Sequence, residues 1–581
     1  MSERRNKVQV AGPMLGTTNI SETAAYAYAA ICSIILSELF PQECHQEFRQ
    51  SYVKTICSRL MLNERVEPVM FILAQGNSGH TEDAYVTLLL EDPTIKGRAV
   101  AIVQDVVLNA LRNGILSGEY DARHRVLARR IAELLKVPFD LVELYELSLV
   151  ERLSQKVEPQ TEKEQKDAKH REKIKKIKRY ASIGLATITG GTLIGVTGGL
   201  AAPLIGVGVG TLLGAAGTSA ALVLSTTAGA AILGSVFGVA GAGLAGYKMN
   251  KRVGEVEEFA FESLSQFPGN ERQLHIAIAV TGWLNDREPD NVVRPWRCLA
   301  VSREQYALRY ETKYLIELGE ALNYILSMAM SAATQEALKY TVLSTLMTAI
   351  AWPAALLSIS SIIDNPWSVC CRRSSEVGKQ LAHVLLTREH GKRPVTLIGF
   401  SLGARVVYYC LREMAQVGGG QGIIQDAIML GTPVTSNKEQ WELCSTIVAG
   451  RMVNGYCSGD WLLKFLYRTL SMATGVAGLV PVQCDKVTNV DLSGIVHGHG
   501  EYLEKLPTLL RHVGLNTRDV EVQDDSTCMK KSSSEVPYTS VSQNTLKTDT
   551  NIKISQSATC LSSTKYLESN NRVKDSDEEQ S

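Results

Sequence analysis

The chain has 581 residues, enough for several domains, and its 60 lysines and arginines balance its 60 aspartates and glutamates. This balance excludes a strongly charged protein, and we expect no nucleic-acid partner. The 12 cysteines have neither metal-binding spacing nor a disulfide pattern, so we expect a reduced, cytosol-facing protein. We predict no metal and no other cofactor. The charged beginning of the chain lacks an apolar run, so no signal peptide is expected.

Residues 1–153 are predicted to form a helical N-terminal domain. After a loose lead-in of about 20 residues, apolar side chains recur at helical spacing, as in residues 97–116. Pro138 separates two further predicted helices, 121–137 and 139–153. No group of residues typical of catalysis occurs in this region. We therefore expect an accessory or docking domain that binds a protein partner.

Residues 154–179 are almost all charged or amide residues, and apolar positions are sparse. Such a pattern is typical of a solvated helix or a short coiled coil rather than of a core. The segment ends in a basic run, Lys173 to Arg179.

Residues 180–247 form a stretch of 68 residues without Asp, Glu, Lys, Arg or His, whereas roughly 20 residues cross a bilayer. Glycines recur at the interval that lets transmembrane helices approach closely. Both flanks are basic, which places both ends in the cytosol and requires an even number of crossings. The segment predicts a transmembrane hairpin, with helices near 181–207 and 220–247. The alternative is a glycine-rich low-complexity or buried soluble segment.

Residues 255–515 alternate between predicted strands and helices, which is typical of an α/β fold with a mostly parallel sheet and helices on both faces. From about residue 516 to 581 the chain is rich in serine, threonine, asparagine and charge, and we expect a disordered tail. The predicted strands are residues 275–280, 305–310, 395–400 and 427–430, one within 447–456, and 487–492.

Residues 312–363 are predicted to be a helical insertion between two of these strands. Within it, residues 341–363 are uncharged and long enough to cross a bilayer. A crossing would put the two halves of one sheet on opposite sides of the membrane. We therefore expect a cap over the active site or a helix that dips into the membrane surface.

Gly399-Phe400-Ser401-Leu402-Gly403 follows the apolar strand 395–400 and precedes a helical pattern. This strand, sharp turn and helix are the context of a nucleophile elbow, in which a serine lies on a strained turn. Gly399 and Gly403 are expected where the strand and helix backbones come close, because a Cβ atom would clash there. The alternative is an ordinary strand-to-helix connection.

A serine nucleophile needs a histidine to take its proton and an acid to hold that histidine. In the α/β-hydrolase fold the chain order is serine, acid, histidine. Ser401 follows the predicted strand 395–400, Asp460 lies two strands later, and His499 follows the last predicted strand. Alone, Asp460 would be interpreted as a helix N-cap and His499 as a loop histidine. The alternatives that stay open are His497 for the base, and Asp485 or Asp491 for the acid.

Two backbone N–H groups are predicted to bind the oxyanion. One belongs to Leu402, the residue after the nucleophile, and the other to the loop after the first predicted strand, with Trp283 favoured. Such donors point at charge that develops only in the transition state.

Together these motifs resemble a eukaryotic family of α/β-hydrolase-like membrane proteins that includes the transmembrane and coiled-coil domain-containing protein 4. The resemblance covers about residues 255–515, and the preceding basic and glycine-rich segments are similar to the family's arrangement. It implies a serine-hydrolase fold in a multi-pass membrane protein, favours His499 over His497, and implies no substrate. The matching pieces are Thr281-Gly282-Trp283-Leu284, Asp364-Asn365-Pro366-Trp367, Gly399 to Arg405, Leu430-Gly431-Thr432-Pro433, and Gly498-His499 with Tyr502.

These observations predict a membrane-anchored serine hydrolase that cleaves an ester or thioester of a lipid or an acylated substrate, next to membrane lipids. Its N-terminal, hydrolase and C-terminal regions are expected to face the cytosol, on an organelle that the sequence does not identify. The rival hypothesis is a non-catalytic membrane scaffold or trafficking adaptor built on a hydrolase fold. A pore is disfavoured, because the hydrophobic segment lacks the ionisable residues that mark ion paths.

Overall fold

The computed structural model describes most of residues 20–518. The described residues are 20–76, 81–117, 119–155, 256–265, 272–299, 304–335, 360–467 and 475–518, with the single residues Val236 and Leu244. Residues 519–581 lie outside the described residues. The predicted coiled coil, hairpin and tail, and most of the uncharged segment 341–363, also lie outside them.

The first part of the chain is helical and has its own hydrophobic core. Ser21 caps the first helix, because its side chain accepts a hydrogen bond from the Ala24 N–H. Apolar faces of these helices, such as Ile31 and Ile35 of the first helix, are buried against one another. The helices are α1 (Glu22–Leu39), η1 (Glu43–His45), α2 (Gln46–Arg59), α3 (Glu67–Ala74), α4 (Glu82–Glu91), α5 (Ala99–Ser117), α6 (Ala122–Leu134) and α7 (Phe139–Gln155).

Within the described residues, seven strands form one sheet in the order β1-β3-β2-β4-β5-β6-β7. Only β1 runs antiparallel, beside β3, and every other neighbouring pair is parallel. Central strands are buried along their whole length, as expected for parallel strands covered by other elements. The strands are β1 (Phe259–Ser263), β2 (Ile276–Val280), β3 (Gln305–Tyr310), β4 (Val395–Phe400), β5 (Ile424–Leu430), β6 (Met452–Tyr456) and β7 (Val487–Asp491).

The prediction of a mostly parallel α/β sheet is confirmed, with two corrections. Strand β1 was not predicted; it lies at the edge of the sheet and pairs only with β3 among the described strands. Helix α14 (Ser360–Leu386) begins inside the predicted helical insertion 312–363 and contains Pro366. Pro366 removes one backbone hydrogen bond from this helix, and Ile363 of the same helix is buried in the core.

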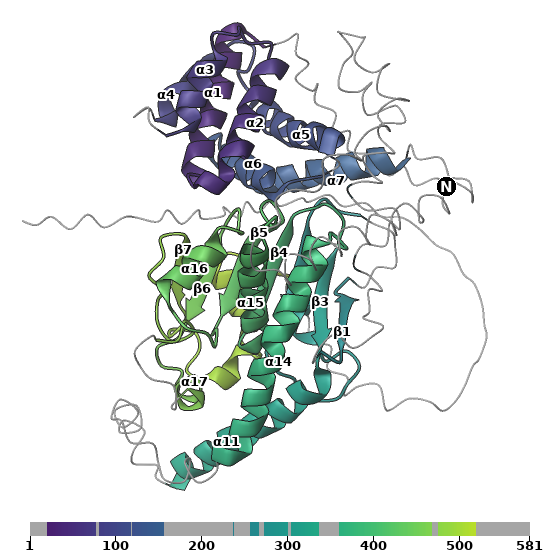
Figure 1. Ribbon diagram of the computed structural model, residues 1–581, viewed down its shortest axis with the longest axis vertical. Coiled ribbons are helices and arrows are strands. Elements are labelled where there is room, and N and C mark those ends of the chain that lie inside the picture. Colours follow the sequence, from purple (N-terminus) through teal and green to yellow (C-terminus); the bar gives the residue numbers. More distant parts are fainter. Residues whose placement is uncertain are drawn as a thin grey trace, which may run out of the picture. The chain divides into compact units, whose positions relative to one another are not determined.

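Two long helices lie side by side on one face of the sheet, with β1 and β7 at opposite edges (Figure 1). They are α14 and α15 (Leu402–Val417), and α15 packs against β2, β4 and β5. Helix α11 (Thr312–Gln335) packs against α14. The remaining elements are η2 (Arg294–Leu299), α16 (Lys438–Ser445), α17 (Trp461–Leu466), η4 (His499–Tyr502) and α18 (Leu506–His512).

Helix α6 joins the helical part to the amino-terminal ends of the parallel strands. The Ala122 N–H donates to the Gly422 carbonyl over 2.8 Å, and Arg129 forms a 3.1 Å ion pair with the buried Asp426 of β5. Breaking a buried pair of this kind leaves an uncompensated charge, which costs several kcal/mol. The helical part is therefore fixed at the edge of the sheet where the parallel strands begin.

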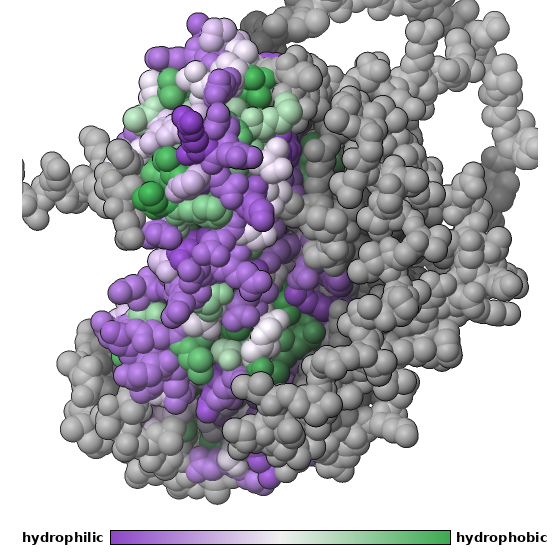
Figure 2. All heavy atoms as spheres, turned by 45° about the horizontal axis from the view of Figure 1, so that its top comes forward, coloured by the Kyte–Doolittle hydropathy of each residue, from purple (hydrophilic) through white to green (hydrophobic). Residues whose placement is uncertain are grey.

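Among the helices of the described part of the chain, none is long and apolar enough to cross a membrane. Figure 2 shows that hydrophilic residues dominate the described surface on the face in view, where hydrophobic residues form small separate groups. This face of the described residues therefore presents no broad apolar patch.

The helical part should lose stability in acid because of His124. Burial lowers the pKa of His124 from 6.5 to about 4, and its ring packs between Phe48 and Tyr52. Between these two pH values the unfolded chain binds a proton that the folded chain does not, so stability falls by up to about 3 kcal/mol as pH drops. Denaturant titrations of the full chain across this pH range should show that the free energy of unfolding falls less for His124→Gln than for the wild type. The matched control, His497→Gln at an exposed histidine, should follow the wild type. If the free energy of unfolding of His124→Gln falls with pH as steeply as that of the wild type, the assignment is wrong.

Candidate active site

Ser401 is the single residue between the end of β4 and the first residue of α15. Its backbone has φ +50° and ψ −126°, a region that residues with a Cβ atom rarely adopt. The turn is held because the Ser401 N–H donates to the Leu430 carbonyl of β5 over 2.8 Å. Strain of this kind persists only where the surrounding structure imposes it, and it is typical of functional sites.

Two glycines make the turn sterically feasible, and they do so against different partners. A Cβ atom on Gly399 would lie 2.6 Å from the backbone of Gly403, so this glycine lets β4 approach its own following helix. A Cβ atom on Gly403 would overlap the carbonyl group of Val280. Gly403 therefore lets α15 approach the neighbouring strand β2, a contact that the local pattern did not indicate.

Three side chains from separate segments meet at the carboxyl edge of the sheet. The Ser401 hydroxyl donates to His499 Nε2 over 2.6 Å, and His499 Nδ1 lies 2.6 Å from Asp460 Oδ2. A carboxylate can only accept, so the proton of the neutral imidazole belongs on Nδ1, and Nε2 is free to accept from serine. The structure thus brings together the three residues that the sequence singled out.

Asp460 also caps a helix, so both interpretations of it apply. Its Oδ1 accepts from the Leu463 N–H over 3.0 Å at the start of α17, while Oδ2 faces His499. A carboxylate is stabilised at this position by the helix dipole. The alternative candidates stay outside the cluster, because His497, Asp485 and Asp491 are exposed.

Aromatic rings surround the imidazole of His499. The Trp283 ring lies 5.4 Å from it and the Tyr502 ring 5.3 Å from it, between centroids. Burial, with the Asp460 carboxylate nearby, raises the pKa of Tyr502 well above its ordinary value, so this hydroxyl stays neutral. The sequence included Tyr502 only as part of a motif, and nothing in its local pattern indicated this packing.

The three clustered side chains are shielded from solvent. Ser401 is 1% exposed, and Asp460 and His499 are 0% exposed. Leu326 of α11 covers the histidine segment at Gly500, where a Cβ atom would lie 2.6 Å from its side chain. Shielding from water strengthens electrostatic interactions within the cluster.

Two backbone N–H groups next to Ser401 are available as donors. Leu402 and Trp283, the predicted oxyanion donors, are buried. Within the described part of the chain, neither backbone N–H donates a hydrogen bond. Because buried N–H groups are almost always paired, two unpaired ones beside a serine indicate a place for a ligand oxygen.

The nearby thiol of Cys457 is a poor alternative nucleophile. It donates to the Val496 carbonyl over 3.3 Å, and burial raises its pKa. A raised pKa keeps the thiol protonated, whereas the thiolate is the reactive form. Among the described residues, no group of three or more His, Cys, Asp or Glu side chains could hold a metal ion.

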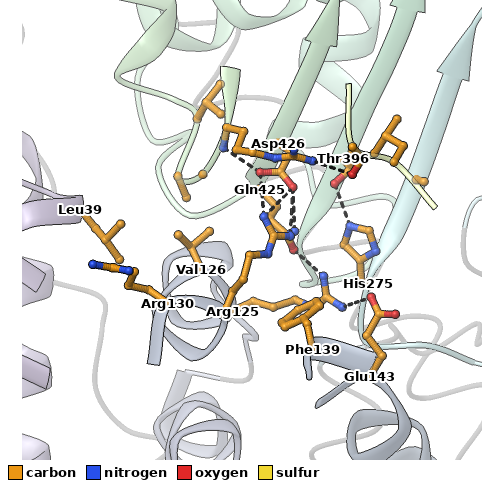
Figure 3. Close-up of a pocket in the computed structure, with 18 of the residues that line it drawn as sticks. Leu39, Arg125, Val126, Arg130, Phe139, Glu143, His275, Thr396, Gln425 and Asp426 are labelled. Carbon is orange, nitrogen blue, oxygen red and sulfur yellow. Dashed lines mark hydrogen bonds and ion pairs between the residues drawn. The ribbon is translucent and has the colours of Figure 1, made fainter. Parts of the chain in front are cut away.

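A separate cavity of about 1160 Å³ lies at the opposite edge of the sheet, beside α6 (Figure 3). Arg125 points into it, but its guanidinium is already bound by Glu146, Glu143 and Gln425 at 2.9 to 3.1 Å. Burial, with Arg125 and Arg129 nearby, lowers the pKa of His275 well below its ordinary value. The charged side chains that line this cavity neutralise one another, so the cavity does not offer the reactive groups of the serine cluster.

A family model described as a protein of unknown function, DUF726, matches residues 175–516 of the chain. This range contains the sheet and all three clustered side chains. No solved structure matches the chain.

Several curated proteins are similar over much of the chain. "Uncharacterized membrane protein F35D11.3" of Caenorhabditis elegans is 43% identical over 81% of this chain and 75% of its own length. "Transmembrane and coiled-coil domain-containing protein STS1" of Oryza sativa is 40% identical over 68% of this chain and 61% of its own length. "Probable lipase MIL1" of Saccharomyces cerevisiae is 32% identical over 73% of this chain, but over only 40% of its own length.

The close approach of α15 to β2 predicts that Gly403→Ala is strongly destabilising. The added methyl group would overlap the Val280 carbonyl, and overpacking of this kind costs about 1–3 kcal/mol or more. Denaturant midpoints of the full chain would measure the loss. Gly494→Ala is the matched control, because a Cβ atom there meets nothing within 4 Å. Equal midpoints for the two variants would show that the backbone contact is absent.

Proposed function

The chain belongs to the DUF726 family, and on that premise we propose that its sheet domain is a serine hydrolase with the α/β-hydrolase fold. Membership agrees with the resemblance seen in the sequence, since one relative is named a transmembrane and coiled-coil domain-containing protein. The strand order, with one antiparallel edge strand, supports this fold assignment. So does the position of the serine after β4, the acid after β6 and the histidine after β7.

The observation that carries the proposal is the continuous hydrogen-bonded chain from Ser401 through His499 to Asp460, with both links at 2.6 Å. A base within hydrogen-bond reach of the nucleophile, itself oriented by a third group, is the geometric requirement for an activated serine. The strained turn at Ser401 adds independent support, because backbone strain of this kind is typical of functional sites.

In the first half of the reaction, Ser401 Oγ attacks the carbonyl carbon of an ester or thioester, and its proton moves to His499 Nε2. Asp460 Oδ2 accepts from Nδ1–H and stabilises the imidazolium that forms. The negative oxygen of the tetrahedral intermediate accepts from the N–H groups of Leu402 and Trp283. The bond to the leaving group then breaks, and the departing alcohol or thiol takes the proton from Nε2.

In the second half, water attacks the acyl–serine carbonyl carbon and gives its proton to Nε2. The same two N–H groups bind the second oxyanion. The bond between the acyl group and Oγ breaks, and Oγ takes the proton back from His499. The free acid leaves and the resting cluster is restored, so no metal or cofactor takes part in these steps.

We propose a lipid or an acylated molecule as the substrate. The chain carries a 68-residue uncharged segment directly before the sheet domain, and such a segment would hold the site beside a bilayer. Of the similar proteins, one is named a membrane protein, a second a transmembrane and coiled-coil domain-containing protein, and a third a probable lipase. The shielding of Ser401 by apolar and aromatic neighbours suits an acyl chain better than a polar substrate.

The proposal predicts that a fluorophosphonate probe labels the full-length wild-type protein in membranes, because the activated serine attacks phosphorus as it would a carbonyl. Ser401→Ala should abolish labelling, and His499→Ala should slow it by about 10³-fold or more, since the general base is lost. The matched control is His497→Ala, at an exposed histidine two residues away, which should label at the wild-type rate.

A folded wild-type protein that resists the probe would overturn the hydrolase proposal. The non-catalytic scaffold would then be the better interpretation of the helical part and of the buried cluster. In that case Ser401→Ala should retain full biological function.

Asp460→Asn should separate the two roles of Asp460. The amide oxygen can still accept from the Leu463 N–H, so stability should stay within about 1 kcal/mol of the wild type. The amide NH₂ facing His499 forces the proton onto Nε2, which can then no longer accept from Ser401. Labelling should fall by about 10³–10⁴-fold. Thermal unfolding and labelling rates measured together test this expectation, and a labelling rate close to wild type would contradict it.

A further inference from the structure

The segment that follows β2 is held in place by side chains of two other segments, η2 and β3. Thr281 is 1% exposed and uses both of its oxygens as acceptors. Its Oγ1 accepts from the indole N–H of Trp296 over 2.8 Å, and its backbone carbonyl accepts from the Tyr310 hydroxyl over 2.7 Å. Trp296 lies on η2 and Tyr310 ends β3, and both side chains are buried.

The same segment touches the catalytic turn directly. A Cβ atom on Gly282 would lie 2.6 Å from both the Phe400 carbonyl oxygen and Ser401 Cβ. Two residues beyond Thr281, the side chain of Trp283 packs edge-on against Phe400 at 5.1 Å between ring centroids. Any shift of Thr281 is therefore transmitted to the position of the Trp283 N–H relative to Ser401.

The far end of the segment is held by α11. The Leu284 N–H donates to the Leu315 carbonyl over 3.2 Å, and Gly319 lets this helix lie against the Leu284 carbonyl. Residues 281–284 are thus held at both ends, and between them the Trp283 N–H has no partner within the described chain.

We propose that Trp296 and Tyr310 are positioning residues, which orient the Trp283 N–H toward the oxyanion through their hydrogen bonds to Thr281. This inference rests on the proposed serine-hydrolase function. Neither side chain touches Ser401, His499 or the reacting atoms in this account. Their role is to fix a donor before the reaction, so that no reorganisation is needed when charge develops.

The size of the effect follows from how sharply such donors depend on position. Removing one oxyanion donor costs about 10²–10³-fold in kcat, and a displacement of about 1 Å can cost as much as 10²-fold. Loss of one of two hydrogen bonds to Thr281 loosens the segment without removing the donor. We therefore expect each single variant to lose about ten-fold in kcat, with KM nearly unchanged because the donor acts on the transition state.

A purely structural role for these hydrogen bonds is the competing explanation, and matched controls separate the two. Trp441 is a buried tryptophan whose indole N–H donates over 2.8 Å to the Thr435 carbonyl. Tyr408 is a buried tyrosine whose hydroxyl donates over 2.8 Å to Gln440. Trp441→Phe and Tyr408→Phe each remove one hydrogen bond that a buried aromatic side chain donates, to partners outside residues 281–284.

The experiment compares Trp296→Phe, Tyr310→Phe and Thr281→Val with the two controls, using the full chain in phosphatidylcholine vesicles. Hydrolysis of p-nitrophenyl butyrate gives kcat and KM, and thermal unfolding gives stability. Thr281→Ser is the rescue variant, because it keeps the acceptor oxygen that Trp296 needs. A trifluoromethyl ketone, which forms an oxyanion on binding serine, provides a readout independent of turnover.

We expect the three test variants to lose about ten-fold in kcat and about ten-fold in affinity for the ketone, while Thr281→Ser stays within about two-fold of wild type. The controls should lose similar stability but keep kcat. If the wild type is active and all three test variants have the same kcat as the wild type, the inference is overturned. It is also overturned if the controls lose as much kcat as the test variants. A wild type that neither hydrolyses the ester nor binds the ketone overturns the proposed function and this inference with it.

Discussion

The structure depends on the close contact between the backbone of α15 and that of strand β2 at Gly403 and Val280. This contact brings the first turn of the helix over the neighbouring strand and forces the chain to reverse within one residue, Ser401. The serine therefore lies above the carboxyl edge of the sheet in a positive-φ conformation. Strand pairing on both sides of β4 absorbs the cost of that strain, because the surrounding hydrogen bonds cannot form if the turn relaxes.

The acid and the histidine reach Ser401 because parallel strands end at the same edge. Asp460 follows β6 and His499 follows β7, so segments distant in sequence converge there. The two groups are fully buried, and a buried carboxylate is costly unless its oxygens are satisfied. Asp460 meets this condition with one oxygen on His499 and the other on the α17 N-terminus. One residue thus begins a helix and orients an imidazole.

The two edges of the sheet carry different roles. At the carboxyl edge, Ser401 and His499 share a hydrogen bond, and the N–H groups of Leu402 and Trp283 have no partner among the residues that the structure describes. At the amino edge, Arg125 and Arg129 of α6 are neutralised by carboxylates and anchor the helical part of the chain. A site with unsatisfied donors can bind a developing charge, whereas one with satisfied ions mainly stabilises packing.

The sequence by itself predicted most strands of the sheet and singled out Ser401, Asp460 and His499 as one group. Apolar strands buried on both faces, the glycines around Ser401 and the chain order of Ser401, Asp460 and His499 are local patterns that need no partner to be recognised. It left His499 and His497 as alternatives for the base, since the sequence does not show which of two histidines in the same loop points toward the serine. It also missed β1, whose identity depends on pairing with β3.

Only the tertiary structure decided which histidine faces the serine, that Gly403 serves the contact with β2, and that Trp296 and Tyr310 hold Thr281. The physical reason is that local patterns report a residue's preference for a conformation or for burial. Hydrogen bonds and close backbone contacts between distant segments exist only once the sheet has brought those segments together.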